Sequence, residues 1–444
     1  MTLYHAATYD PSEVDSLWRA TAAPATAFGA LDGDLDAEVA IIGGGYTGLS
    51  AALHLARDHG VHAVVLEASA IGWGASGRNG GFCVPGGAKI SLAAMASRHG
   101  EDEARRFFDL TLAAVGRVGA LLADEAIAAA PQPGGELTLA HSRKALGALA
   151  RERDEIVALH GHVRELLSPD ALREQGLHAP VFFGGLREPV GFGLHPLDYV
   201  RGLARTADRR GARIFEHSAV TAWRREGGRH RLETAGGAVR AGKVIVATGG
   251  YLPEALNPGL AGRVLPILSN IIATRPLTSA EQADQGWTST QMVCDSRALL
   301  HYFRLLPDGR FLFGGRGGLG DDPSARAAFR ARLTADFHKA FPAWREVDIT
   351  HFWRGLVDLS ADLVPHCAAL EGDASVLVGC AYHGSGVSMA TETGAQLAAL
   401  AVGQQVDALP DFMRRPPPRF PLPGLRKLYL AGAIAGYALS DRFN

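Results

Sequence analysis

The sequence is poor in cysteine, in long apolar runs and in excess charge of either sign. Its four cysteines, Cys83, Cys294, Cys367 and Cys380, form no CxxC pair, which argues against a disulfide framework or a zinc site and fits a reducing compartment. No apolar run reaches the roughly 18 residues that a membrane-spanning helix needs. The formal net charge of −2 gives no indication of a nucleic-acid partner. We therefore expect a cytoplasmic protein with no bound metal.

The two ends of the chain refine this expectation. Residues 1–18 are polar and acidic, and they lack the basic start and apolar core of a signal peptide. Residues 428–439 are mostly apolar and follow directly on Arg426 and Lys427. This run predicts a terminal helix that either packs on the protein or makes a peripheral contact with a membrane.

Residues 36–69 carry the strongest motif. The apolar run at 39–42 predicts a buried strand, and Gly43, Gly45 and Gly48 follow it in GxGxxG spacing. A helical pattern and a second strand at 63–66 come next, and that strand ends in Glu67. The glycines allow a tight turn, a close approach of backbone to a pyrophosphate, and close helix–strand packing, while the acid can bind a ribose hydroxyl. The segment therefore predicts a dinucleotide site.

Two later segments favour FAD over NAD. Residues 243–250, KVIVATGG, form a second apolar strand ending in small residues, as expected where an open α/β sheet admits its ligand. Residues 375–386 form a last strand and a glycine-rich loop that feeds a helix. The N-terminus of that helix can stabilise negative charge on a reduced flavin.

The order of elements predicts an α/β fold with a Rossmann-like, discontinuous FAD-binding domain and an inserted mixed-sheet, α+β substrate-binding domain. We assign 1–35 to an N-terminal arm and 425–444 to a C-terminal helix. The FAD-binding domain takes 36–90, 190–260 and 350–424. The substrate-binding domain takes 91–189 and 261–349.

Motifs along nearly the whole chain resemble the D-amino-acid-oxidase-type FAD-dependent oxidoreductases, which include glycine and sarcosine oxidases. These are IGGGYTGLSAALHLA, VVLEAS, LHPLDYVRGLA, VIVATGGY and the closing glycine loop. The versions IGWGASGRNGGF and RKLYLAGAIAGYALSDRF most resemble the gamma-glutamylputrescine oxidase branch. The resemblance implies these cofactor-binding residues: Gly43, Gly45, Tyr46, Thr47, Gly48, Glu67, Ala68, Gly74, Ala75, Ser76, Arg78, Asn79, Gly80, Gly81, Val220, Ala247, Thr248, Gly249, Gly384, Ser385, Gly386 and Val387.

The sequence also departs from its relatives. Val357 stands where the glycine oxidases carry a carboxylate-binding arginine, which favours an amine or an acid held elsewhere. The arginines considered for such a carboxylate are Arg297, Arg304, Arg316 and Arg354. The relatives' flavin-linking Cys and His are missing from 353–355 and 75–81, so we expect non-covalent FAD. No Lys occupies 309–314, where sarcosine oxidases place one near the flavin, so electrons pass either to oxygen or to a quinone.

The implied reaction is oxidation of a C–N bond by hydride transfer to flavin N5, giving an imine that hydrolyses. Candidate substrates are a gamma-glutamylated amine or other polyamine derivative, and a secondary amine or imino acid. His383 is a candidate acid or base because histidine titrates near neutral pH, and Tyr302 and His301 are candidate substrate contacts. A membrane-coupled amine or amino-acid dehydrogenase and a non-catalytic flavin-binding subunit remain as alternatives.

Overall fold

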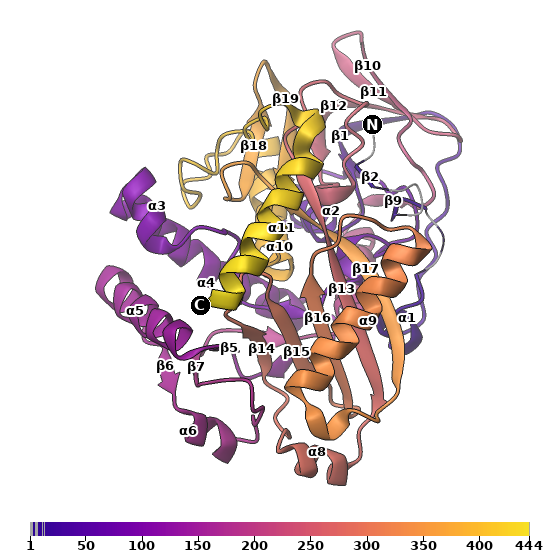
Figure 1. The fold of residues 1–444 in the computed structure, drawn as a ribbon. Helices are drawn as coiled ribbons and strands as arrows, with labels where there is room; N and C mark the ends of the chain where they lie inside the picture. The colour runs from indigo at the N-terminus through magenta and orange to yellow at the C-terminus, as the bar shows by residue number, and fades with distance from the viewer. Residues whose placement is uncertain (1–2, 5–7, 11, 13, 444) are drawn as a thin grey trace.

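The computed structural model describes residues 3–4, 8–10, 12 and 14–443. Two eight-stranded sheets and one three-stranded sheet form its framework. In the view of Figure 1 the first sheet occupies the upper half, the second occupies the lower half, and the C-terminal helix crosses in front of both.

The first sheet has a parallel core in the order β19-β12-β1-β2-β9. Its strands are β1 (Leu35–Ile42), β2 (Val64–Leu66), β9 (Arg213–Phe215), β12 (Ala238–Val246) and β19 (Asp373–Cys380), with the antiparallel β10 (Ala222–Glu226), β11 (Arg229–Glu233) and β18 (His366–Leu370). The central strands are rich in Val and Ile and are buried on both faces, as is usual in parallel sheets.

Four helices pack together around one apolar core against this sheet: α2 (Tyr46–His59), α4 (Glu101–Asp124), α7 (Pro196–Arg209) and α10 (Gly386–Ala401). The short helix α3 (Leu92–His99) precedes α4. We assigned 91–189 to the substrate-binding domain, but α4 packs on α10 of the cofactor-binding part, because its apolar stripe, including Phe107 and Leu110, joins that core.

The second sheet runs in the order β17-β13-β16-β15-β14-β5-β7-β6. Its strands are β5 (Glu136–Leu139), β6 (Glu165–Leu167), β7 (Gly185–Glu188), β13 (Leu265–Pro276), β14 (Met292–Asp295), β15 (His301–Leu305), β16 (Arg310–Arg316) and β17 (Ile349–Leu359). Helix α9 (Pro323–Ala340) covers one face of this sheet (Figure 1). Phe303 and Phe311 of the sheet and Phe337 of α9 belong to the aromatic core between them. The predicted α/β architecture with a second mixed sheet is confirmed.

A second part of our domain assignment also differs from the structure. We placed residues 350–424 in the FAD-binding domain, whereas β17 pairs with β13 over nearly its whole length in the second sheet. The reason is long-range pairing between two long apolar strands, which local sequence patterns do not reveal.

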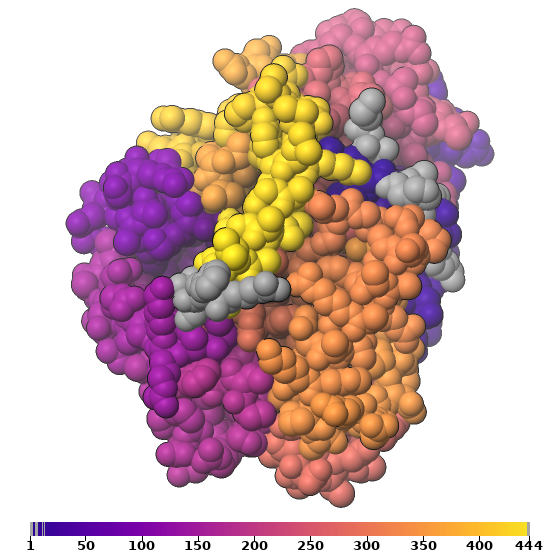
Figure 2. Space-filling model, viewed as in Figure 1, coloured from indigo at the N-terminus to yellow at the C-terminus, as the bar shows by residue number. Residues whose placement is uncertain are grey.

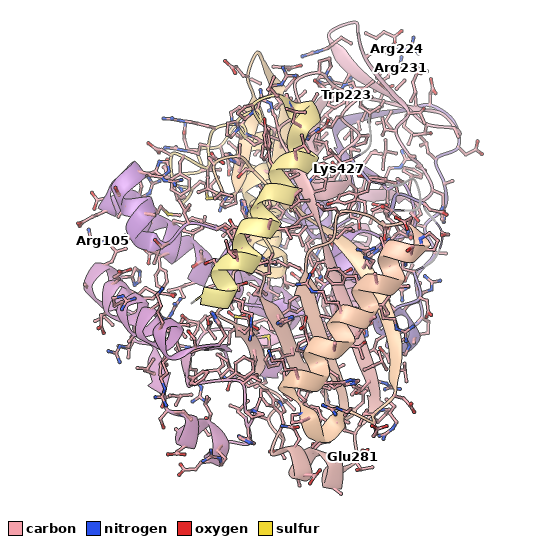
Figure 3. The ribbon with its side chains drawn as sticks, in the orientation of Figure 1. Arg105, Trp223, Arg224, Arg231, Glu281 and Lys427 are labelled. Atoms are coloured by element: carbon pink, nitrogen blue, oxygen red, sulfur yellow. The ribbon has the colours of Figure 1, made fainter. Side chains whose placement is uncertain are left out.

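The remaining elements connect or flank these layers. They are α1 (Leu17–Thr21), α5 (Arg143–His160), α6 (Pro169–Glu174), α8 (Ser279–Gln285) and the three-stranded sheet of β3 (Phe82–Cys83), β8 (Phe192–Gly193) and β4 (Gln132–Pro133). Figure 3 labels Arg224 and Arg231 on the hairpin β10–β11 and Glu281 on α8, all at the periphery of the molecule.

The terminal helix α11 (Arg426–Phe443) lies as a ridge across the face seen in Figure 2. Leu430 and Ile434 pack on a cluster with Tyr4 and Leu268, whereas Leu428 remains 65% exposed. In the described part of the chain, no helix combines the length and the apolar character required to cross a bilayer.

Candidate FAD and substrate site

A cavity of about 570 Å³ lies where the carboxyl ends of β1, β2, β12 and β19 meet the second sheet. The carboxyl edge of a parallel sheet is where open α/β folds bind ligands. Of the predicted cofactor-binding residues, Gly48 and Gly81 do not line the cavity, and all the others do. Four sequence segments that are far apart therefore converge on one wall.

The glycine turn after β1 leaves no room for side chains. Gly43 has a φ of 110°, and a Cβ there would lie 2.7 Å from the carbonyl oxygen of Ala247. A Cβ on Gly48 would lie 2.0 Å from the carbonyl oxygen of Gly43. Gly48 thus acts through close packing of α2 on the turn, which explains its absence from the cavity wall.

Helices α2 and α10 both begin at this cavity. Their N-cap residues, Gly45 and Ser385, supply no side-chain cap to the first turn. The positive ends of two helix dipoles therefore face the space in which the resemblance places pyrophosphate and flavin.

Glu67 closes the far side of the turn. Its Oε2 accepts a hydrogen bond from the Gly44 amide at 2.7 Å, and its Oε1 accepts one from the Ser69 amide at 2.9 Å. Burial raises the pKa of the Glu67 carboxyl, which these amides counteract. The carboxylate is therefore held rigidly at the cavity wall, where it can accept a hydroxyl donor such as a ribose hydroxyl.

The loop at 71–82 holds Arg78 in a fixed position. Its guanidinium stacks on the Trp73 ring at 4.4 Å and donates to the carbonyl oxygens of Trp73 and, at 3.1 Å, Arg354. Arg78 Nη2 is buried without a partner among the described residues, and so is the Thr248 hydroxyl. Unpaired buried polar groups in a cavity wall require a polar ligand. Together with the glycine turn and the two helix ends, they fit FAD.

His383 lies in the loop between β19 and α10 and is only 3% exposed. Burial, with the nearby charges of Arg316 and Lys89, lowers its pKa to about 3, so the ring is neutral near pH 7. The Ser360 hydroxyl donates to the carbonyl oxygen of Val364 at 2.8 Å, so toward His383 Nε2, 3.3 Å away, it acts as the acceptor. This network assigns the proton to Nε2 and leaves Nδ1, which has no partner among the described residues, as an acceptor.

Tyr302 and His301 are neighbours on β15 and point to opposite faces of the sheet. Tyr302 lines the cavity, and its hydroxyl lies 2.9 Å from Ser269 Oγ. His301 does not line the cavity: it stacks on Phe313 and pairs with Asp295 at 3.0 Å and Asp336 at 3.4 Å. These acids outweigh burial and raise the pKa of His301 to about 9. We therefore no longer propose His301 as a substrate contact.

Several polar residues of the second sheet that were not predicted from the sequence also line the cavity. Glu136 and Cys294 do so, and of the four arginines considered for a carboxylate only Arg316 does. Arg354 instead pairs with Asp321, and Arg297 with Asp295. Lys89, from the loop after β3, also lines the cavity. No motif marks these positions, and the available signal was the alternation of polar and apolar residues in β5.

Comparison with known proteins agrees with this geometry. Residues 38–400 match the family model DAO, described as FAD dependent oxidoreductase. The chain is 32% identical over 437 residues to "Probable oxidoreductase OrdL" of Rhizobium meliloti (strain 1021), covering 96% of this chain and 97% of the relative. It is 32% identical over 439 residues to "Gamma-glutamylputrescine oxidoreductase" of Escherichia coli (strain K12), covering 96% and 98%.

The fold is also similar to solved structures. Glycine oxidase from Geobacillus kaustophilus superposes with a TM-score of 0.69 at 19% identity, over 84% of this chain and 96% of that one. An L-amino acid deaminase from Proteus myxofaciens gives a TM-score of 0.71 at 16% identity, over 88% and 96%. The family match spans both sheets and every segment of the cavity wall that the predicted cofactor-binding residues form, which we call the cofactor wall. The chain therefore belongs to the DAO family of FAD-dependent oxidoreductases.

Proposed function

We propose that this protein oxidises an amine, with non-covalent FAD bound along the wall formed by residues 42–84, 219–220, 247–253 and 382–390. Bound FAD would supply an acceptor for a hydride from the carbon next to the amine nitrogen, and water would hydrolyse the resulting imine to a carbonyl compound. The observation that carries the proposal is one cavity with a cofactor wall on the first sheet and a polar substrate wall on the second.

His383 and Tyr302 are the proposed polar contacts for the reacting amine. His383 Nδ1 is a neutral acceptor, so it can accept a hydrogen bond from the N–H of an uncharged amine. Burial raises the pKa of Tyr302 to about 12, so its hydroxyl stays protonated and acts as a hydrogen-bond donor to substrate. Both groups therefore favour an uncharged amine in a site from which water is excluded.

Anaerobic titration of the holoenzyme with amines tests the proposal. We expect bleaching of the flavin band near about 450 nm by a gamma-glutamylated polyamine or a secondary amine, because the cofactor supplies that chemistry. Bleaching by 2-hydroxy acids alone would contradict amine oxidation. Absence of bleaching by any amine would support a non-catalytic flavin-binding subunit instead. Release of FAD on acid precipitation checks the non-covalent attachment.

Oxygen is the proposed electron acceptor, giving hydrogen peroxide. One observation favours a membrane quinone as the alternative. Helix α11 exposes the apolar side chains of Leu428, Tyr437 and Leu439 and carries an exposed Lys427 in its first turn, as an interfacial helix can. Stopped-flow reoxidation of the reduced enzyme separates the two. Fast reaction with oxygen supports the oxidase, whereas reoxidation only by a quinone, with sedimentation on anionic vesicles, supports the dehydrogenase.

A further inference from the structure

The part of the cavity that the second sheet forms gathers several polar side chains, and we call this part the substrate wall. Ser269, Arg316, Tyr302, Cys294 and Glu136 come from five different strands of the second sheet, and all of them line the cavity. The strand registers explain this arrangement. Ser269 pairs with Arg316, Gly314 with Tyr302, and Tyr302 with Cys294, so these side chains share one face.

Glu136 belongs to the same face through its strand. Thr138 pairs with Cys294, and Glu136 lies two residues before Thr138, which returns its side chain to the cavity side. The carboxyl group lies beside the Cys294 thiol, and burial raises its pKa to about 7. Among the described residues Glu136 has no ion-pair partner, so a cationic ligand would supply the missing charge.

Two cationic residues, Arg316 and Lys89, line the same cavity. A Cβ on Gly384 would lie 2.0 Å from Arg316 Nη2, so the guanidinium is wedged against the loop that precedes α10. Arg316 Nη1 is buried, and no described residue pairs with it. Lys89 stands close enough that Arg316 is the main cause of the fall in its pKa to about 7.

Lys89 is fixed in position by its backbone. Its amide donates to the carbonyl oxygen of Leu363 at 2.9 Å, and the Ser388 hydroxyl holds the same loop through the carbonyl oxygen of Val84 at 2.7 Å. Neither Lys89 nor Arg316 forms an ion pair within the part of the chain that the structure describes. Two like charges are held together here, and Glu136, although near enough to act on Arg316, forms no ion pair with either cation among the described residues. Such a pair of cations can bind an anion.

We propose that this wall recognises an amino-acid end group on the substrate, with Arg316 and Lys89 binding its carboxylate and Glu136 binding its ammonium. The assignment rests on the proposed amine oxidation and narrows the substrate class to amines that carry a zwitterionic end, such as a gamma-glutamyl group. A substrate with a carboxylate but no second ammonium would leave Glu136 without a cationic partner. A plain diamine would leave Arg316 and Lys89 without an anionic partner.

Kinetics of anaerobic flavin reduction test the proposal. Four amines are compared: putrescine, gamma-glutamylputrescine, its N-acetyl derivative, and its α-carboxamide derivative. For the wild-type holoenzyme we expect the zwitterionic amine to bind roughly 10- to 100-fold more tightly than either blocked derivative, since each block removes one charge-assisted contact. Equal affinity for all four amines would overturn the proposal.

The variants assign each contact. Arg316→Met is expected to abolish the preference for gamma-glutamylputrescine over its α-carboxamide derivative. Glu136→Gln is expected to abolish the preference for gamma-glutamylputrescine over its N-acetyl derivative. Arg310→Met is the matched control: Arg310 lies on the same strand but pairs with Asp308 outside the cavity, so its variant should retain both preferences. If Arg316→Met and Glu136→Gln weaken the binding of all four amines to the same extent, the two residues have a structural role only. Flavin content and Tm are measured for each variant to identify a folding defect. Arg316→Lys is included as the conservative variant of Arg316.

A binding measurement separates this inference from the proposed function. Gamma-glutamylbutylamide carries the zwitterionic end but no terminal amine, and its binding is read from the shift of the flavin absorption band. Saturable binding that Arg316→Met weakens at least about tenfold supports the receptor even if no amine reduces the flavin. No binding, or flavin reduction by this ligand, would overturn it, because reduction would place the α-amine at the reacting position.

Discussion

The carboxylate of Asp441, in the last turns of α11, accepts a hydrogen bond from the amide of Ala298 at 2.9 Å. It accepts a second one from the Leu299 amide at 3.2 Å. The next residue, Leu300, lines the cavity. The C-terminal helix therefore tethers the loop that enters β15 at the substrate side of the site.

Asp441→Ala is expected to loosen this loop. Two amides lose their acceptor, so we expect faster hydrogen exchange and faster proteolysis within residues 296–300, and a KM for the amine raised several-fold. Flavin content should not change, because the cofactor wall lies on other segments. Asp407→Ala is a surface control without this tether. Unchanged exchange in the loop would refute the tethering role.

Gly43→Ala is expected to prevent FAD binding. A left-handed φ of 110° and an approach of 2.7 Å to the carbonyl oxygen of Ala247 both penalise a Cβ there. Gly60→Ala, at the other end of α2, serves as the control, because its φ is also positive but no atom lies within 4 Å of a Cβ. It should cost about 1 kcal/mol of stability and leave the flavin bound. Full flavin content in Gly43→Ala would contradict the tight-turn argument.

Buried neutral histidines are expected to make the protein sensitive to acid. Burial lowers the pKa of His383 to about 3 and that of His54 to about 4, below the unfolded value of about 6.5. Both groups bind fewer protons when folded, so stability is lost as the pH falls from 6.5 toward these values. Each contributes up to about 1.4 kcal/mol per pH unit in that window.

Urea midpoints between pH 4.5 and 6.5 check this sensitivity. His383→Gln and His54→Gln should each make the urea midpoint depend less on pH. Only His383→Gln should also slow flavin reduction, because His54 lies outside the cavity. An unaltered slope in both variants would show that neither ring is the acid-sensitive group.

His301 has the opposite pH dependence. Asp295 and Asp336 outweigh burial and raise its pKa to about 9, so its stabilisation is complete below about pH 6.5 and is lost as the pH rises to 9. The stability difference between wild type and His301→Gln should therefore be larger at pH 6 than at pH 9.5. Asp336→Asn, which removes one partner, should give a smaller difference with the same sign. A difference that grows with pH would contradict the assigned ion pairs.

The buried arginines Arg354 and Arg304 are expected to differ in their contribution to the stability of the fold. Arg354 pairs with Asp321 at 2.5 Å and donates to Asn270, so Arg354→Met leaves a buried acid without its main partner and should cost about 3–5 kcal/mol. Arg304 is 1% exposed, has no ion pair among the described residues, and donates through Nη2 to the carbonyl oxygen of Leu194. Arg304→Met should change stability by less than about 1 kcal/mol. Equal losses in thermal unfolding would refute the distinction.

The sequence by itself determined the cofactor wall of this protein. Gly43, Gly45 and Glu67 belong to one local strand–turn–helix–strand unit, and glycine spacing restricts the backbone whatever surrounds it. The later segments, at 247–249 and 384–387, could be added because parallel strands end at the same edge of a sheet. The fold class followed from the same order of elements.

Only the tertiary structure decided the substrate wall. Glu136, Cys294, Tyr302 and Arg316 meet because long-range strand pairing fixes the register, and a shift of one residue would turn each of them to the aromatic core. The same alternation points Tyr302 into the cavity and His301 toward Asp336 on α9. The membership of β17 in the second sheet likewise depends on pairing between residues that are 75 to 94 positions apart. Local patterns contain none of these distances, so cofactor binding could be predicted from the sequence, whereas Glu136, Cys294 and Lys89 could not be assigned to the proposed substrate side, and Arg316 could not be distinguished from the other arginines.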